Sequence, residues 1–388
     1  MLQLLSGGGC GASLAELADP RRPPAAGARA TTLGGAVTAA IDDAPLAPLT
    51  TLRLGGPARR LVTAATEQEL IDAVHACDAA GEPVLLLAGG SNLVIADAGF
   101  DGTVVRVATR GVERSRAGAT VHVHAAAGES WDDLVAALVA DGLAGVECLA
   151  GIPGSAGATP IQNVGAYGQE VARVIHGVRV LDRTTGEIAQ LRPVECGFAY
   201  RTSAFKRSAR HVILGVTFEL AVSATSEPLR YAELARALGV PAGERAPLAD
   251  VRDAVLALRR AKAMVLDPDD HDTWSAGSFF TNPVLDADDF ERLAARAAAL
   301  PGPGPPRFPE PDGRVKTSAA WLIEHAGFGK GERRGAVGIS TRHALALTNR
   351  GGATTAALVA FAREIAAGVE ERFGVRLEPE PVLVGVRL

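Results

Sequence analysis

Apolar residues recur along this chain with the spacing of either a helix or a strand. Over residues 67–79 they return every three or four positions, which predicts an amphipathic helix that Gly81 ends. The run 84–88 that follows is short and apolar, as in a buried strand, and residues 93–95 and 103–107 predict further strands. This order indicates a small α/β unit.

Two more regions follow this unit. In the second, predicted elements are an alternating strand, an amphipathic helix, a hairpin and a further strand at residues 121–125, 131–139, 178–188 and 212–220. In the third, helices are predicted near residue 251 and at residues 288–300, 317–326 and 354–373, with a Pro-rich connector at 301–311 and short strands within 335–349. We therefore expect units over 41–108, 109–250 and 251–380, after a disordered leader at 1–40.

Composition narrows the classes of protein to consider. The 388 residues are 47% hydrophobic and 21% charged, as in globular proteins, and the net charge of −5 comes with scattered Lys and Arg. Duplex nucleic acid needs a basic stripe, and a membrane span needs about 18 consecutive apolar residues, so we expect neither partner. Four isolated cysteines favour a reducing, cytoplasmic location.

Histidines give no sign of a metal site in the sequence. His122 and His124 alternate on one face of a predicted strand, but Cys, Asp or Glu partners at ligand spacing are absent. We predict no metal.

The first candidate motif is Gly89-Gly90-Ser91-Asn92, which continues into Leu93 directly after the buried strand. Glycines here let backbone N–H groups point at a ligand, and the Ser and Asn side chains add donors, which suits a diphosphate. By itself the motif is more typical of a simple turn.

The second candidate is the Gly-rich stretch 150–168. A flexible linker is the alternative, but linkers are polar, whereas this stretch keeps Ile152, Ile161 and Val164. Its density of glycine predicts a backbone held close to a flat or charged group. The candidate binding residues are Gly151, Gly154, Ser155, Gly157, Ala158, Thr159, Gln162, Asn163, Gly165, Ala166 and Tyr167.

Four motifs in order resemble the UDP-N-acetylenolpyruvoylglucosamine reductases. They are residues 150–168, Tyr200-Arg201-Thr-Ser-Ala-Phe205, Ala276-Gly-Ser278-Phe-Phe-Thr-Asn282-Pro, and Leu377-Glu-Pro-Glu380. The resemblance runs from about residue 49 to the C-terminus. It implies an α+β fold in which 41–108, with a C-terminal strand at 381–388, and 109–250 form an FAD-binding unit of the vanillyl-alcohol-oxidase type. Residues 251–380 would form an α/β substrate-binding domain.

The resemblance also implies the activity. NADPH reduces FAD, and the reduced flavin passes a hydride to the vinyl group of UDP-N-acetylglucosamine enolpyruvate, in peptidoglycan precursor synthesis. Arg201 matches the arginine that faces the substrate carboxylate, Ser278 the proton donor, and Glu380, rather than Glu378, the carboxyl group near the developing charge. A planar guanidinium suits a growing carboxylate charge.

Further matched positions concern the sugar nucleotide. Tyr231, Lys262 and Asn282 resemble family contacts to the UDP group, and Tyr231 places the chain with the longer form of the family. The link from Lys262 to Ser278 is longer than the family pattern. We expect only small-molecule partners and a monomer.

Two other functions stay open at this point. One is an FAD-dependent sugar or hydroxy-acid oxidase of the same fold, which often tethers its flavin through His or Cys; none lies between residues 149 and 174. The other is a catalytically inactive sugar-nucleotide-binding regulator, which would be expected to lose Arg201, Ser278 or Glu380.

Overall fold

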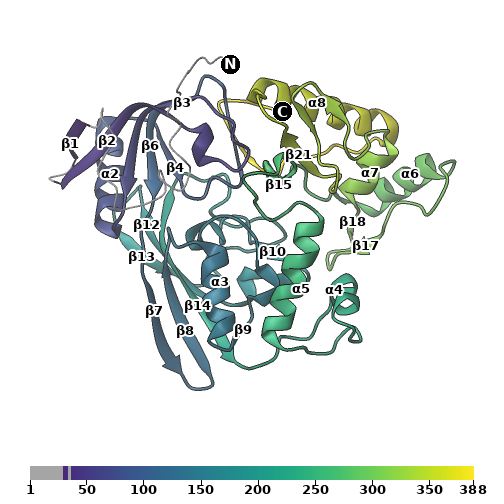
Figure 1. Ribbon diagram of the computed structural model, residues 1–388, viewed down its shortest axis with the longest axis horizontal. Helices are drawn as coiled ribbons and strands as arrows, with labels where there is room; N and C mark the ends of the chain where they lie inside the picture. Colours follow the sequence, from purple (N-terminus) through teal and green to yellow (C-terminus); the bar gives the residue numbers. More distant parts are fainter. Residues whose placement is uncertain (1–28, 34–35) are drawn as a thin grey trace, which may run out of the picture.

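The computed structural model describes residues 29–33 and 36–388, whose elements form three groups (Figure 1). The first group is a sheet in the order β1-β2-β3-β6-β4 with helix α2. Its members are β1 (Arg29–Leu33), β2 (Ala36–Pro45), β3 (Pro57–Ala64), α2 (Glu67–Ala80), β4 (Val84–Leu87) and β6 (Phe100–Val107). The predicted helix and strands of this unit are confirmed.

Helix α2 has strong local signals at both ends. Thr66 and Glu69 form a capping box at its start, and Gly81 ends it in the left-handed conformation, with φ of 62°. Its buried face, which includes Leu70 and Val74, packs on the first sheet and on strands of the second. The two sheets therefore share a core through this helix.

The second group is a larger antiparallel sheet in the order β13-β12-β14-β8-β7, with β9 also on β14. The strands are β7 (Val112–Ala117), β8 (Thr120–Ala126), β9 (Leu143–Ala144), β12 (Ile175–Asp182), β13 (Ile188–Leu191) and β14 (His211–Val222). The helices are α3 (Trp131–Ala140), α4 (Ala232–Ala237) and α5 (Leu248–Ala261). The long Gly-rich stretch contains a short 3-10 helix at Ala156–Ala158 and strand β10 (Gly165–Ala166), which pairs with β11 (Gln169–Glu170) just after it.

Helix α5 corrects the expected boundary at residues 250 and 251. Its apolar side chains Val251, Val255 and Leu256 are buried in the core of the second group, together with Trp131 of α3. The sequence places the start of the third unit at this helix. Its apolar face decides otherwise, because it covers α3 and not the elements after it.

The third group combines small sheets with helices. The strands are β15 (Ser275–Ser278), β16 (Val284–Leu285), β17 (Phe308–Pro309), β18 (Val315–Lys316), β19 (Arg333–Arg334), β20 (Val337–Ile339) and β21 (Ala346–Asn349). The helices are α6 (Ala287–Ala297), α7 (Ala319–His325) and α8 (Thr355–Phe373). After α8 the chain returns, and β22 (Val382–Val384) pairs in parallel with β5 (Leu93–Ile95). The predicted C-terminal strand thus lies beside the first unit.

The leader predicted at 1–40 ends earlier than expected. Strands β1 and β2 pair antiparallel with Leu33 opposite Ala36, and β2 continues onto β3. A Gly-Gly dipeptide between two runs with strand propensity is a hairpin signal that the sequence analysis overlooked. The rest of the leader prediction lies outside the described residues. Among those that are described, no helix combines the length and apolarity that crossing a bilayer needs.

Candidate active site

The two Gly-rich segments meet where the sheets join. A Cβ on Gly89 would lie 2.7 Å from Cα of Gly154, and one on Gly154 would lie 3.0 Å from Oγ of Ser91. Gly90 has φ of 58°, and a Cβ there would lie 2.0 Å from the carbonyl oxygen of Leu49. Part of the glycine requirement is therefore close packing of the backbone around these loops.

Donors at this junction fit a bound diphosphate. The backbone N–H groups of Gly89, Gly90, Ser91 and Asn92 find no acceptor in the described part of the chain. The hydroxyl of Ser155 is buried and likewise has no partner within residues 29–33 and 36–388. Consecutive free N–H groups form an anion-binding concavity, and a buried hydroxyl without a partner is costly unless a ligand satisfies it. These residues can hold the phosphates of FAD.

The other residues predicted to bind FAD lie on the same two segments, with different local roles. Asn163 uses its amide within the protein, donating to Glu170 and to the carbonyl of Ala199 and accepting from N–H of Ala172. Its side chain therefore shapes the loop. The others are Leu93, Gly151, Gly157, Ala158, Thr159, Gln162, Gly165, Ala166 and Tyr167.

An ion pair between Arg201 and Glu380 lies beside these loops. Nε of Arg201 is 3.4 Å from Oε1 of Glu380, and the guanidinium donates to the carbonyl of Gly165 at 2.7 Å. The side chains are only 22% and 15% exposed. Burial raises the pKa of Glu380, against the opposing effect of Arg201 and Lys206. The carboxyl group is thus poised to take up or release a proton.

Backbone strain gathers around this ion pair. Arg201, Asn163 and Tyr167 have φ of 51°, 47° and 48°, a left-handed conformation that side chains with a Cβ seldom adopt. Such residues cost stability and cluster at functional sites. The strain therefore supports a binding role for this region.

Ser278 and Glu380 reach the site on adjoining backbone segments. The N–H of Glu380 donates to the carbonyl of Phe279 at 2.9 Å, next to Ser278 at the end of β15. Ser278 is half-buried, and its hydroxyl has no protein partner in the described ranges. Asn92 links the segments to the first loop, because its amide donates to Gln162 at 2.8 Å and approaches the carbonyl of Glu380 at 3.4 Å. Glu378 is exposed, which favours the choice of Glu380.

A second cluster brings Tyr231 and Lys262 together. The ring of Tyr231 meets that of Tyr167 edge-on at 5.4 Å, and Nζ of Lys262 lies 5.8 Å from the centre of Tyr167. Lys262 also pairs with Glu233 at 2.7 Å. Burial raises the pKa of Tyr167 to about 12, so its hydroxyl stays protonated at neutral pH. The long link after Lys262 does not displace it from this cluster.

Asn282 lies apart from that cluster, next to Tyr200. Its amide oxygen accepts from N–H of Ala319 at 3.0 Å, and its side chain lies near the hydroxyl of Tyr200. Two lysines that were not predicted from the sequence also lie here. Nζ of Lys206 donates to the carbonyl of Arg201 at 2.7 Å, and Nζ of Lys316 lies 4.5 Å from the ring centre of Tyr200. The sequence offered a reason to consider Lys206, because it directly follows the motif that contains Arg201.

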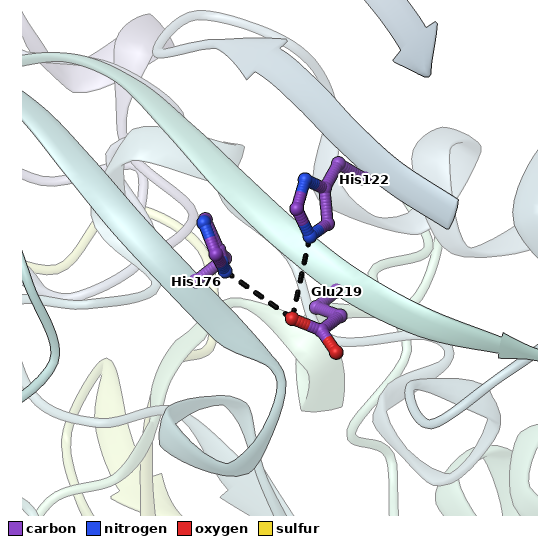
Figure 2. Close-up of side chains that lie close together, drawn as sticks. All are labelled: His122, His176 and Glu219. Atoms are coloured by element: carbon purple, nitrogen blue, oxygen red, sulfur yellow. Dashed lines mark hydrogen bonds and ion pairs between the residues drawn. The ribbon is translucent and has the colours of Figure 1, made fainter. Parts of the chain in front are cut away.

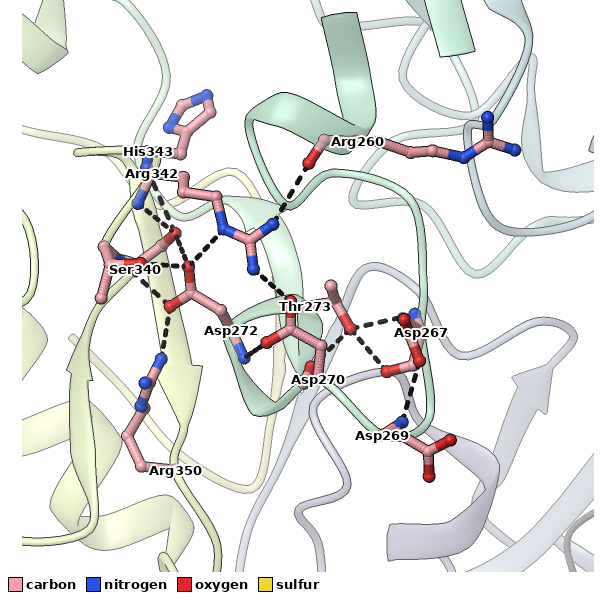
Figure 3. A network of polar contacts seen from close by, with 11 residues as sticks. Arg260, Asp267, Asp269, Asp270, Asp272, Thr273, Ser340, Arg342, His343 and Arg350 are labelled. Atoms are coloured by element: carbon pink, nitrogen blue, oxygen red, sulfur yellow. Dashed lines mark hydrogen bonds and ion pairs between the residues drawn. The ribbon is translucent and has the colours of Figure 1, made fainter. Parts of the chain in front are cut away.

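The link after Lys262 docks onto the third group through a buried carboxylate. Asp272 accepts hydrogen bonds from Ser340 at 2.9 Å and from both N–H and hydroxyl of Thr341, and it pairs with Arg342 and Arg350 (Figure 3). The extra length is therefore ordered structure that connects α5 to the loop after β20.

The spacing along the sequence predicted no Cys, Asp or Glu partner for His122, but the structure places Glu219 beside it. In the sheet, Glu219 of β14 lies 3.3 Å from His122 and 3.2 Å from His176 of β12. Neighbouring strands supply these partners, so spacing along the chain could not predict them.

Comparison with known proteins identifies the family of this chain. A family model described as an FAD binding domain matches residues 58–192, and one described as the C-terminal domain of UDP-N-acetylenolpyruvoylglucosamine reductase matches residues 267–384. The chain is 60% identical over 352 residues to a UDP-N-acetylenolpyruvoylglucosamine reductase of Streptomyces coelicolor, covering 90% of this chain and 91% of that protein. The chain belongs to the UDP-N-acetylenolpyruvoylglucosamine reductase family.

Other relatives agree with this membership. A reductase of the same name from Thermobifida fusca is 58% identical, covering 89% of this chain and 98% of that protein. A crystal structure of the Thermus caldophilus reductase matches with a TM-score of 0.59 at 24% identity, covering 89% of this chain and 98% of that one, which bears on the fold alone. The resemblance, the α+β class and the flavin-binding unit are confirmed, and the chain is an oxidoreductase. The C-terminal family match begins at residue 267, after α5, in agreement with the corrected boundary.

Proposed function

We propose that this protein reduces UDP-N-acetylglucosamine enolpyruvate to UDP-N-acetylmuramate with FAD and NADPH, as a step in peptidoglycan precursor synthesis. The observation that carries the proposal is the buried pair of Arg201 and Glu380 beside the junction of the two Gly-rich loops. Family membership supports the reaction class. When bound, FAD supplies the hydride that the vinyl carbon of the substrate accepts.

The residues of the chain would handle the charge and the proton. Arg201 grips the substrate carboxylate, whose negative charge grows as hydride arrives, and a guanidinium offers two parallel donors for it. Ser278 gives a proton to the neighbouring carbon, which is basic enough at that moment to accept one from a hydroxyl. Glu380, whose pKa is raised by burial, lies beside Arg201 and would assist proton transfer near the same centre.

The nucleotide end of the substrate would lie at the second cluster. Lys262 is a point charge suited to a diphosphate, and Tyr231 is exposed at the start of α4, where it can cover a ligand. Asn282 was predicted to join them, but its place beside Tyr200 supports a contact nearer to Arg201.

An assay of NADPH oxidation tests the proposal. The purified protein should be yellow and release FAD on heating, and it should oxidise NADPH rapidly only when UDP-N-acetylglucosamine enolpyruvate is added. A protein that binds no flavin after reconstitution, or one that oxidises NADPH equally with and without this substrate, would refute it. The monomeric state and the cytoplasmic location stay predictions, which size-exclusion chromatography and cell fractionation would check.

A further inference from the structure

Three potential metal ligands converge on the face of the second sheet that lies opposite its core. His122, His176 and Glu219 come from the neighbouring strands β8, β12 and β14, with the glutamate in the middle strand (Figure 2). On β14 the flanking Phe218 and Leu220 are fully buried in the core. Because side chains alternate along a strand, Glu219 must point away from that core.

The backbone, rather than chance surface contact, sets this arrangement. His122 lies directly opposite Glu219 in the antiparallel register of β8 and β14. In β12, Ile175 pairs with Phe218 and Gly177 with Thr217, so His176 is the extra residue of a β-bulge. A bulge redirects a side chain and is an ordered feature of a sheet. Here it turns His176 toward the same carboxylate that faces His122.

The distances suit a coordination shell and are long for hydrogen bonds to a carboxylate. Nε2 of His122 and Nδ1 of His176 lie 3.3 Å and 3.2 Å from the same oxygen, Oε2 of Glu219. Charge-assisted hydrogen bonds are shorter, at about 2.7–2.9 Å. A tetrahedral ion with bonds of about 2.0–2.1 Å holds its ligand atoms about 3.3–3.4 Å apart. The ligand atoms of the three side chains all lie within 4.8 Å of one another.

We propose that His122, His176 and Glu219 bind a zinc ion, with water completing the coordination. Two imidazole nitrogens and one carboxylate oxygen form a ligand set that zinc takes in proteins, whereas calcium and magnesium prefer oxygen ligands alone. The side chains are 27%, 50% and 45% exposed, so the ion can enter and leave. None of the three residues is among those assigned above to flavin or substrate.

Bound zinc would join three strands and neutralise Glu219. The hydroxyl of Thr120 approaches the other oxygen of Glu219 at 3.5 Å, which leaves Oε2 free for the ion. Thr120 and Glu219 also line a cavity of about 260 Å³ that extends to Tyr167 and Arg230. We therefore expect zinc to stabilise the second sheet, because an ion that binds only the folded state shifts unfolding to higher temperature.

The test uses FAD-loaded protein without an affinity tag. Cobalt(II) serves as a spectroscopic probe, read as a difference spectrum over the flavin bands, and zinc is then titrated in competition. The variants are His176→Ala and Glu219→Gln, both at exposed positions. The matched control is His124→Ala, since His124 lies on the same face of β8 but contacts Thr217 at 3.1 Å.

The proposal expects one zinc per chain, a thermal midpoint that rises with zinc, and a loss of affinity of roughly tenfold or more in both variants but not in the control. It is overturned if the unaltered protein binds no zinc at micromolar concentration, or if His176→Ala binds it as tightly. Equal weakening by His124→Ala would also overturn it, since the ion would then sit on a diffuse histidine surface. Flavin content and the thermal midpoint without zinc show whether each variant is folded.

Discussion

Asp272 and Glu380 are both buried carboxylates beside arginine, but the protein surrounds them differently. Asp272 is 3% exposed and accepts hydrogen bonds from Ser340 and Thr341 in addition to its arginine partners. Burial alone would raise the pKa of Asp272, yet these hydrogen bonds bring it below the ordinary value. Glu380 has one guanidinium at 3.4 Å, and its pKa is raised by burial.

The difference separates a structural carboxylate from a functional one. A charge whose lone pairs are all satisfied stays ionised and joins segments of the fold, as Asp272 joins the link after α5 to the loop after β20 (Figure 3). A charge with few partners keeps capacity for a proton or a ligand at some cost in stability. Four substitutions test this distinction.

The largest effect is expected for Ser278→Ala. The hydroxyl that we assign to protonation is lost, while the donors at the loop junction remain, so NADPH should still reduce the flavin at a nearly normal rate. Reoxidation by the enolpyruvyl substrate should slow about 10³-fold, the scale of general acid catalysis. Stopped-flow absorbance of the flavin separates the two half-reactions. Equal losses in both would contradict the assigned role.

Arg201→Lys should reduce kcat/KM about 10²-fold in steady-state turnover. The charge is kept, but an ammonium group offers no planar pair of donors for a carboxylate. Arg207→Lys, at an exposed position in the same loop that also has a left-handed φ of 60°, is the control and should be near normal. Normal turnover of the Arg201 variant would exclude bidentate binding.

Asp272→Asn should lower the free energy of unfolding by about 3 kcal/mol, because it leaves the partly buried Arg350 without a counter-charge. Denaturant titration measures this loss. Asp269→Asn, at an exposed position on the same link, should change it little. If both variants were equally stable, the network would not be structural.

The smallest effect is expected for Glu380→Gln, and its sign is the test. The raised pKa means that the native protein binds a proton that the unfolded chain has released above its ordinary value of 4.5. Stability of the unaltered protein therefore falls as pH rises through this interval. Gln cannot titrate, so the variant should become progressively more stable than the parent from pH 4.5 upward, with reduced turnover. Thermal midpoints measured across pH would refute the idea if the variant were less stable at neutral pH.

Local sequence patterns determined much of the molecule. The helix α2, with Thr66 and Gly81 at its ends, depends on groups within a few residues of each other, and the apolar run before Gly89 marked strand β4. Dense glycine and the four ordered motifs indicated the flavin-binding segments and the family. Such signals survive without tertiary information because caps, turns and periodicity act over short distances.

Only the tertiary structure decided which distant groups meet. Arg201 and Glu380 are far apart in sequence, as are His122 and Glu219, and each contact depends on strand register or on the return of the chain after α8. The membership of α5 and the satisfied state of Asp272 were decided in the same way. Whether a buried charge serves structure or chemistry depends on the hydrogen bonds that its neighbours in space supply, and the linear order of residues does not specify those neighbours.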